Sequence, residues 1–188
     1  EKMLYDNAQM IRVFSVFDLL NNDIKYEFLV RKTIDYWLEL SSKNQQLFPA
    51  SIDADNNDGE GAYYVFKKSE IEENLSHQEQ NYCQSNFNMT QDMLWENTWH
   101  MHRIKYENSE IAKKTISKLE KIRKGKSFPA IDKKAICSWN CMMVIGLLDS
   151  SIAYKNTGWL DKAENLLNIV LKRFTNNKYQ CIRLVYVD

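Results

Sequence analysis

The sequence predicts a mainly α-helical fold of repeated helical hairpins, with short β-strands in the connecting loops. Its 188 residues include only 5 Gly and 2 Pro, too few for the many tight turns of a β-sandwich. Apolar residues recur at helical spacing in two pairs of segments, and one constant shift, which carries Asn7 onto Asn140, aligns the pairs without a gap. Hairpins that cannot bury their apolar faces alone stack on neighbours, so we expect a solenoid or an α/α toroid.

The first hairpin is expected at residues 3–41. Apolar side chains recur near a period of 3.6 in 3–20 and again in 24–41, and the polar Asn21–Asp23 segment interrupts them. Because the connection is short, the two helices should pack antiparallel.

The second hairpin is expected at residues 134–175, with helices at 134–156 and 159–175. Under the same shift its residues resemble those of the first hairpin, as in Asn7 with Asn140, Met10 with Met143, Ile11 with Val144, Ile34 with Leu167 and Leu38 with Leu171. The segments 48–55 and 181–188 also fall in register, and we expect a terminal strand at 181–187.

The segment between the hairpins is less regular. An acidic loop and a short strand are expected in 44–75, with the strand at 62–66 and a short helix that Ser69 caps. Residues 76–108 are rich in Asn, Gln and aromatic side chains and predict irregular structure. Residues 109–124 predict a basic helix with one apolar stripe.

Charge and composition exclude several classes of function. The 25 Lys and Arg balance the 25 Asp and Glu, so the chain lacks the basic excess that nucleic acids and anionic membranes attract. We interpret the basic residues of 109–124 as a solvated helix face. The sequence shows neither a signal peptide nor an apolar run long enough to cross a bilayer, so we expect no membrane span and a cytoplasmic protein.

The cysteines predict neither a disulfide framework nor a metal site. Their spacing contains no Cys-x-x-Cys pair, and a reduced compartment would leave them as small apolar residues. They are Cys83, Cys137, Cys141 and Cys181. We therefore expect no metal and no cofactor.

Four motifs, in order along nearly the whole chain, resemble one family. The matching segments are Glu1–Ala8 (EKMLYDNA), Ser51–Asp55 followed by Glu60–Phe66, Trp95-Glu96, and Asp132–Asn140 with its Ser-Trp-Asn end. They are similar to the thioredoxin-domain-containing proteins related to spermatogenesis-associated protein. The sequence departs from the family pattern at Ala130 and Lys133, and Gln46-Leu47 replaces a Gly-Gly pair.

This resemblance implies a domain plan and a fold. Members carry a thioredoxin-like domain followed by a helical toroid of the six-hairpin glycosidase and N-acylglucosamine 2-epimerase kind. By the resemblance, residues 1–188 are a partial α/α toroid, a fragment that lacks the thioredoxin-like domain. An incomplete toroid should expose apolar helix faces, so we expect it to self-associate.

The candidate site residues are those that a sugar-like ligand would need. Aromatic faces pack on the sugar ring, while amides and carboxylates bind its hydroxyls. The ligand-binding candidates are Tyr5, Asn7, Glu60, Trp95, His100, His102, Asp132, Trp139 and Asn140. The alternatives are helix-start Asn residues that bond the backbone and ordinary polar loop residues.

The catalytic candidates are four carboxylates: Asp6, Asp53, Asp55 and Glu96. Paired carboxylates supply general acid and base in glycoside hydrolysis, and an epimerase would use such groups to move a proton beside a carbonyl. A solvated acidic turn is the alternative for Asp53 and Asp55. The sequence thus favours a carbohydrate-active domain, or else a non-catalytic toroid module that binds a ligand or partner, and it leaves open whether the chain is an enzyme.

Overall fold

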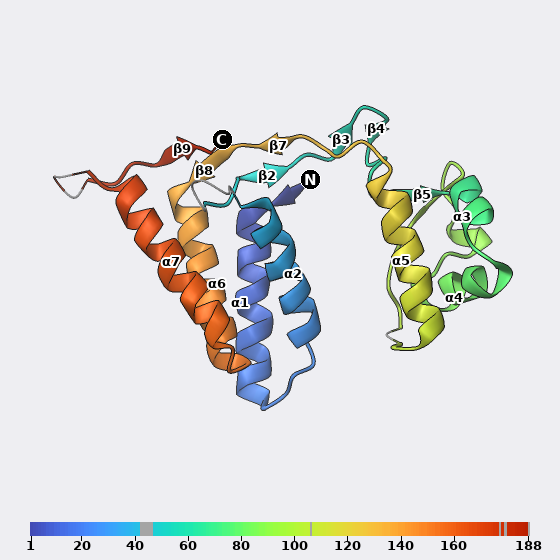
Figure 1. The fold of residues 1–188 in the computed structure, drawn as a ribbon, viewed down its shortest axis with the longest axis horizontal. Coiled ribbons are helices and arrows are strands. Elements are labelled where there is room, and N and C mark those ends of the chain that lie inside the picture. The colour runs from blue at the N-terminus through green and yellow to red at the C-terminus, as the bar shows by residue number, and fades with distance from the viewer. Residues whose placement is uncertain (42–46, 106, 177, 179, 188) are drawn as a thin grey trace. The chain divides into compact units, whose positions relative to one another are not determined.

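The computed structural model describes residues 1–41, 47–105, 107–176, 178 and 180–187 (Figure 1). The chain divides into two compact units. Unit 1 comprises residues 1–53 and 131–188, and unit 2 comprises residues 54–130. Both are mainly helical with short strands, which confirms the predicted class.

Unit 1 holds the two predicted hairpins (Figure 1). The first consists of β1 (Lys2–Met3), α1 (Leu4–Asn21), α2 (Glu27–Leu40) and β2 (Ser51–Ile52). The second consists of β8 (Lys134–Ile136), α6 (Cys137–Ala153), α7 (Thr157–Phe174) and β9 (Leu184–Tyr186). A further strand, β7 (Ile131–Asp132), pairs antiparallel with the other edge of β2.

The sequence repeat extends to single hydrogen bonds. The strand pair β1–β2 aligns Met3 with Ser51, and the pair β8–β9 aligns Ile136 with Leu184, their counterparts under the repeat shift. In the first hairpin the Leu4 N–H donates to the Ala50 carbonyl at 2.9 Å, and in the second the Cys137 N–H donates to the Arg183 carbonyl at 2.9 Å. In both hairpins the returning strand therefore satisfies an amide that the helix start would leave unpaired.

The helices α1 and α6 pack side by side and run parallel. Residue numbers rise together along their contacts, which are Tyr5 with Trp139, Ile11 with Gly146, Arg12 with Asp149, Ser15 with Ser150 and Asp18 with Tyr154. The Ser15 and Ser150 hydroxyls lie 2.9 Å apart at fully buried positions. Small side chains at this contact let the two backbones approach closely.

Several boundaries in unit 1 differ from the prediction, including the helix expected to end at 156, which ends at Ala153, and the helix expected from 159, which begins at Thr157. The helix expected from 134 begins at Cys137, because residues 134–136 pair with β9. The helix expected from 24 begins at Glu27, because the Asp18 carboxylate accepts the Tyr26 N–H at 2.7 Å and holds the turn. The terminal strand spans only Leu184–Tyr186. Part of the expected acidic loop, residues 44–46, lies outside the described residues.

Unit 2 is built around two helices that pack on each other. Its elements are β3 (Asp55–Asn56), β4 (Gly59–Glu60), β5 (Val65–Lys67), α3 (Lys68–Asn74), α4 (His77–Phe87), a 3-10 turn (Gln91–Met93), β6 (Thr98–His100) and α5 (Glu110–Lys124). The apolar stripe predicted for 109–124 packs on α4 and on the β5–β6 pair, in a core that includes Phe66, Cys83 and Leu119.

The prediction of irregular structure for 76–108 is wrong over residues 77–87, which form α4, and over 98–100, which form β6. Ser76 caps this helix: its N–H donates to the Glu79 carboxylate at 2.7 Å, and its hydroxyl accepts the Glu79 N–H at 3.4 Å. The expected strand at 62–66 lies instead at 65–67, paired with β6. The following helix begins at Lys68 rather than after Ser69, because the Glu70 carboxylate accepts the Lys67 N–H at 2.7 Å.

Candidate functional site

The end of unit 1 at which α1 and α6 begin carries two aromatic side chains in contact. The Tyr5 and Trp139 ring centroids lie 4.8 Å apart with an interplanar angle of 58°, and both residues are half-buried. Tyr5 and Trp139 are both ligand-binding candidates from the sequence, but their contact was not predicted, since the counterpart of Trp139 under the repeat shift is Asp6. Asp6 follows Tyr5 in the first turn of α1 and is exposed.

The two asparagines at the same end bond the backbone. The Asn7 side-chain amide donates to the Met3 carbonyl at 2.7 Å, and the Asn140 amide donates to the Ile136 carbonyl at 3.1 Å. Asn140 is fully buried and also holds Phe48, accepting its N–H at 2.9 Å and donating to its carbonyl at 3.2 Å. Both amides thus make the helix-start bonds of the alternative interpretation, and ligand binding by them stays a prediction.

Two more of the predicted acids lie on or directly after the strands at this end of unit 1. Asp132 belongs to β7, directly opposite Ser51 of β2, and its carboxylate pairs with the Lys134 ammonium at 2.9 Å. This hydrogen-bonded pairing raises the pKa of Lys134. Asp53 follows β2 and is exposed. The candidates Asp6, Asp53 and Asp132 therefore all belong to the strand-bearing end of unit 1.

The remaining candidates belong to unit 2. Asp55 and Glu60 face each other across the β3–β4 pair and are exposed. Glu96 lies in the turn between the bridged residues Trp95 and Thr98, with a positive φ of 45°. The predicted ligand residues His100 and His102 are exposed. The four candidate catalytic acids are thus divided between the two units, and within the described part of the chain no cluster of His, Cys, Asp and Glu could hold a metal ion.

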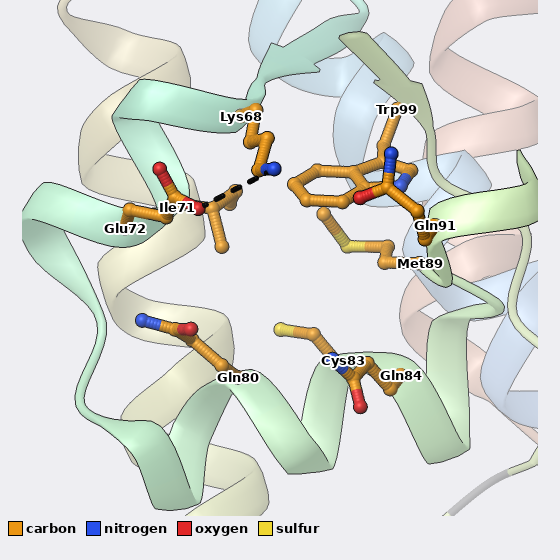
Figure 2. Close-up of a pocket in the computed structure, with 9 residues that line it drawn as sticks. All are labelled: Lys68, Ile71, Glu72, Gln80, Cys83, Gln84, Met89, Gln91 and Trp99. Atoms are coloured by element: carbon orange, nitrogen blue, oxygen red, sulfur yellow. Dashed lines mark ion pairs between the residues drawn. The ribbon is translucent and has the colours of Figure 1, made fainter. Parts of the chain in front are cut away.

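Unit 2 contains a cavity that sequence reasoning missed (Figure 2). Its volume is about 200 Å³, and its lining includes Gln80 and Cys83 of α4, Lys68 and Glu72 of α3, and Trp99 of β6. Lys68 and Glu72 are 3.8 Å apart across its upper side (Figure 2). Burial, together with the nearby charge of Glu79, raises the pKa of Cys83 to about 12, so its thiol is protonated at neutral pH.

A buried ion pair joins α4 to α5. The Glu79 side chain exposes no surface, and one of its oxygens accepts the Lys118 ammonium at 2.6 Å while Lys114 lies 3.8 Å from the other. Burial alone would raise the pKa of Glu79, but the hydrogen bonds from Lys118 and from the Ser76 N–H and hydroxyl outweigh burial and lower it to about 2. The pair binds two elements together and is not part of the cavity lining.

Comparison with known proteins adds a distant and uncharacterised relative. No protein-family model matches the sequence. The chain is similar to the uncharacterized protein B0495.5 of Caenorhabditis elegans, at 23% identity over 228 aligned residues. The match takes in all of this chain but only 31% of the relative, so the chain spans about a third of the protein it resembles. Among the described helices, none has the length and apolar character needed to cross a bilayer.

Proposed function

We propose that unit 1 is two neighbouring repeats of an α/α toroid, and that its strand-bearing end binds a sugar-like ligand. In such a toroid, parallel inner helices alternate with outer helices that return the chain. The parallel contact of α1 with α6, together with the antiparallel return of each through α2 and α7, supports this arrangement. The shared strand register of the two hairpins supports it independently.

The Tyr5–Trp139 pair carries the ligand proposal. Two half-buried rings from separate repeats are in contact at the N-terminal ends of α1 and α6, where a sugar ring could pack on their exposed faces. The exposed Asp6 carboxylate adjoins Tyr5 and would accept hydrogen bonds from the ligand's hydroxyls. Asp6 and Asp53 are the groups at this end that would supply acid–base chemistry in an enzyme.

Trp139→Ala should weaken sugar binding about tenfold, the amount expected from loss of one aromatic stacking contact. The measurement is saturation-transfer NMR and calorimetry with a panel of aldoses, ketoses and N-acyl amino sugars. Trp95→Ala is the matched control, because Trp95 is an exposed tryptophan of unit 2. Binding that survives Trp139→Ala but is lost in Trp95→Ala would move the site to unit 2, and no binding by any sugar of the panel would remove the proposal.

A second candidate function, self-association through the helix faces, is favoured by unequal burial of equivalent residues. On α6 the stripe Trp139, Met143, Gly146 and Ser150 packs on α1. Its counterpart on α1 under the repeat shift is Asp6, Met10, Val13 and Phe17. Met143 is 1% exposed, whereas Met10 is 51% exposed. We call Met10, Val13 and Phe17 the α1 face; it lies beside a surface hollow of about 440 Å³.

At the α2–α7 contact the pattern is reversed: the residue of the first hairpin is buried and its counterpart in the second hairpin is exposed. Ile34 of α2 is 1% exposed and lies one turn beyond Arg31, whose guanidinium stacks 4.9 Å above the Trp159 ring of α7. Its counterpart Leu167 is 41% exposed. We call the exposed residues Ile145, Leu167 and Leu171 the α6–α7 face. Within the chain, α1 and α6 are joined by the ion pair Arg12–Asp149. Under the repeat shift the counterpart of Arg12 is Ile145 and that of Asp149 is Val16. A contact between the two open faces would therefore place apolar side chains where this ion pair lies.

We therefore infer that the α1 face of one copy of this chain binds the α6–α7 face of a second copy. Such head-to-tail contacts build rings or open filaments rather than closed two-fold dimers. Val13→Glu places a charge in the centre of the α1 face, and we expect it to abolish concentration-dependent association in sedimentation velocity. Met93→Glu, at an exposed position in unit 2, should leave association unchanged.

A further inference from the structure

Three of the four cysteines gather where α6 begins. Cys137 is the first residue of α6, and its sulfur lies 3.6 Å from that of Cys181, which lies on the segment that leads into β9. Cys141 follows one helical turn after Cys137 on the same face. The fourth cysteine, Cys83, is buried in unit 2.

The backbone on both sides fixes this thiol pair. Next to Cys137, the β8–β9 ladder aligns Ile136 with Leu184, and the Cys137 N–H donates to the Arg183 carbonyl at 2.9 Å. Next to Cys181, the Ile182 N–H donates to the Phe174 carbonyl at 2.6 Å. A disulfide needs the two sulfurs to close by about 1.5 Å, a movement that side-chain rotation can supply.

The equivalent positions of the first hairpin indicate the structural role of the Cys137–Cys181 contact. The counterparts of Cys137 and Cys181 in the first hairpin are Leu4 and Phe48. Both belong to the buried core of unit 1, with exposed fractions of 0% and 3%. In the first hairpin, buried apolar side chains therefore hold the returning strand to the helix start, whereas the second hairpin places two thiols there, one of them exposed.

We propose that Cys137 and Cys181 are a redox modification site at which a reversible disulfide fastens β9 to the start of α6. A low-molecular-weight disulfide, such as oxidised glutathione, is the oxidant. The exposed Cys181 thiolate attacks one glutathione sulfur, forms a mixed disulfide and releases one glutathione thiolate. Cys137 then attacks the Cys181 sulfur, the protein disulfide forms and the second glutathione leaves. The two thiol protons end on the two glutathiones, so the protein loses two electrons and one glutathione disulfide gains them.

The environment of Cys137 makes it the second thiol to react. Burial, then the hydrogen bond with Cys181 and the neighbouring Cys141, raises the pKa of Cys137 to about 12. It therefore rests as a thiol, while the exposed Cys181 meets the oxidant first. The link would join residues 44 positions apart, so it should stabilise the unit by restricting its unfolded chain.

The test is incubation of the whole chain in glutathione buffers of increasing oxidised fraction, followed by non-reducing peptide mapping. We expect a Cys137–Cys181 cross-linked peptide and a Tm increase of about 5 °C or more, both reversed by dithiothreitol. Cys181→Ser should lose both effects, and Cys83→Ser and Cys141→Ser should keep them. A Cys137–Cys141 link, glutathione adducts without a cross-link, links between chains, or reduced thiols throughout would each overturn the proposal. Thermal melts of the reduced variants separate any loss of folding from loss of the cross-link.

Discussion

Gly146→Val should destabilise unit 1 by about 2–3 kcal/mol, because Gly146 lies in a close contact between α1 and α6. A Cβ at this position would lie 3.0 Å from the Ala8 carbonyl oxygen and 3.2 Å from Cγ2 of Ile11. Valine adds two further methyl groups to that contact, and the backbone of α1 cannot rotate out of the way as a side chain could. Chemical unfolding followed by circular dichroism measures the change in the free energy of unfolding.

Gly158→Ala is the matched control within the same unit. Gly158 is exposed in α7, and its added methyl would meet only the Asn156 side chain, at 3.3 Å. We expect Gly158→Ala to change the free energy of unfolding by less than about 1 kcal/mol. The Gly146→Ala variant should be less stable than the Gly158→Ala variant. If Gly146→Val unfolds at the wild-type denaturant concentration, the close packing of α1 on α6 is wrong.

Lys118→Met should destabilise unit 2 by about 2–3 kcal/mol, because it breaks a buried ion pair. Removing Lys118 leaves the buried Glu79 charge with the hydrogen bonds from Ser76 and with the Lys114 ammonium, which lies 3.8 Å away. Breaking a buried pair costs about 3–5 kcal/mol, and partial exposure of Lys118 reduces that value. Lys113→Met is the control on the same helix: Lys113 pairs with Glu110 and both side chains are exposed, so its loss should destabilise the unit much less than loss of Lys118. Equal losses in the two variants would contradict the assignment.

The same pair predicts how stability depends on pH. The pKa of Glu79 is about 2 in the folded chain and near 4.5 when unperturbed. A lowered folded-state pKa contributes stability that is fully present above the unfolded value and is lost as pH falls through the folded value. Stability should therefore fall between about pH 4.5 and pH 2, and this dependence should shrink in Lys118→Met. Hydrogen exchange of the α4 amides, followed by mass spectrometry, locates the effect in unit 2.

The helical hairpins could be predicted because their information is local and repeated. Apolar periodicity located α1, α2, α6 and α7, and the repeat shift aligned the first hairpin with the second. The same shift aligns 48–55 with 181–188, but it did not predict that these segments pair with β1 and β8, because residues 2–3 and 134–136 were expected in or next to helices. Strand pairing explains the error at the start of α6, because residues 134–136 fit both a helix and a strand until β9 is placed beside them.

The structure of unit 2 depended on contacts that no local pattern contains. The helix α4 has few apolar residues, and its capping pair Ser76 and Glu79 was the one local signal that could have located it. Its stability rests on Lys118, 39 residues further along the chain. The cavity against Trp99 follows from that packing and could not be predicted without it. Similarly, the Cys137–Cys181 contact appears only once β9 returns to α6.

The most direct test of the central claim, that unit 1 carries complementary open faces, is to mix two variants. Val13→Glu blocks the α1 face and leaves the α6–α7 face intact, whereas Leu167→Glu does the reverse. In sedimentation velocity we expect oligomers of the wild type, monomers of each variant alone, and dimers when the two variants are mixed. A wild type that stays monomeric at all concentrations, or a variant mixture that stays monomeric while the wild type associates, would contradict the account.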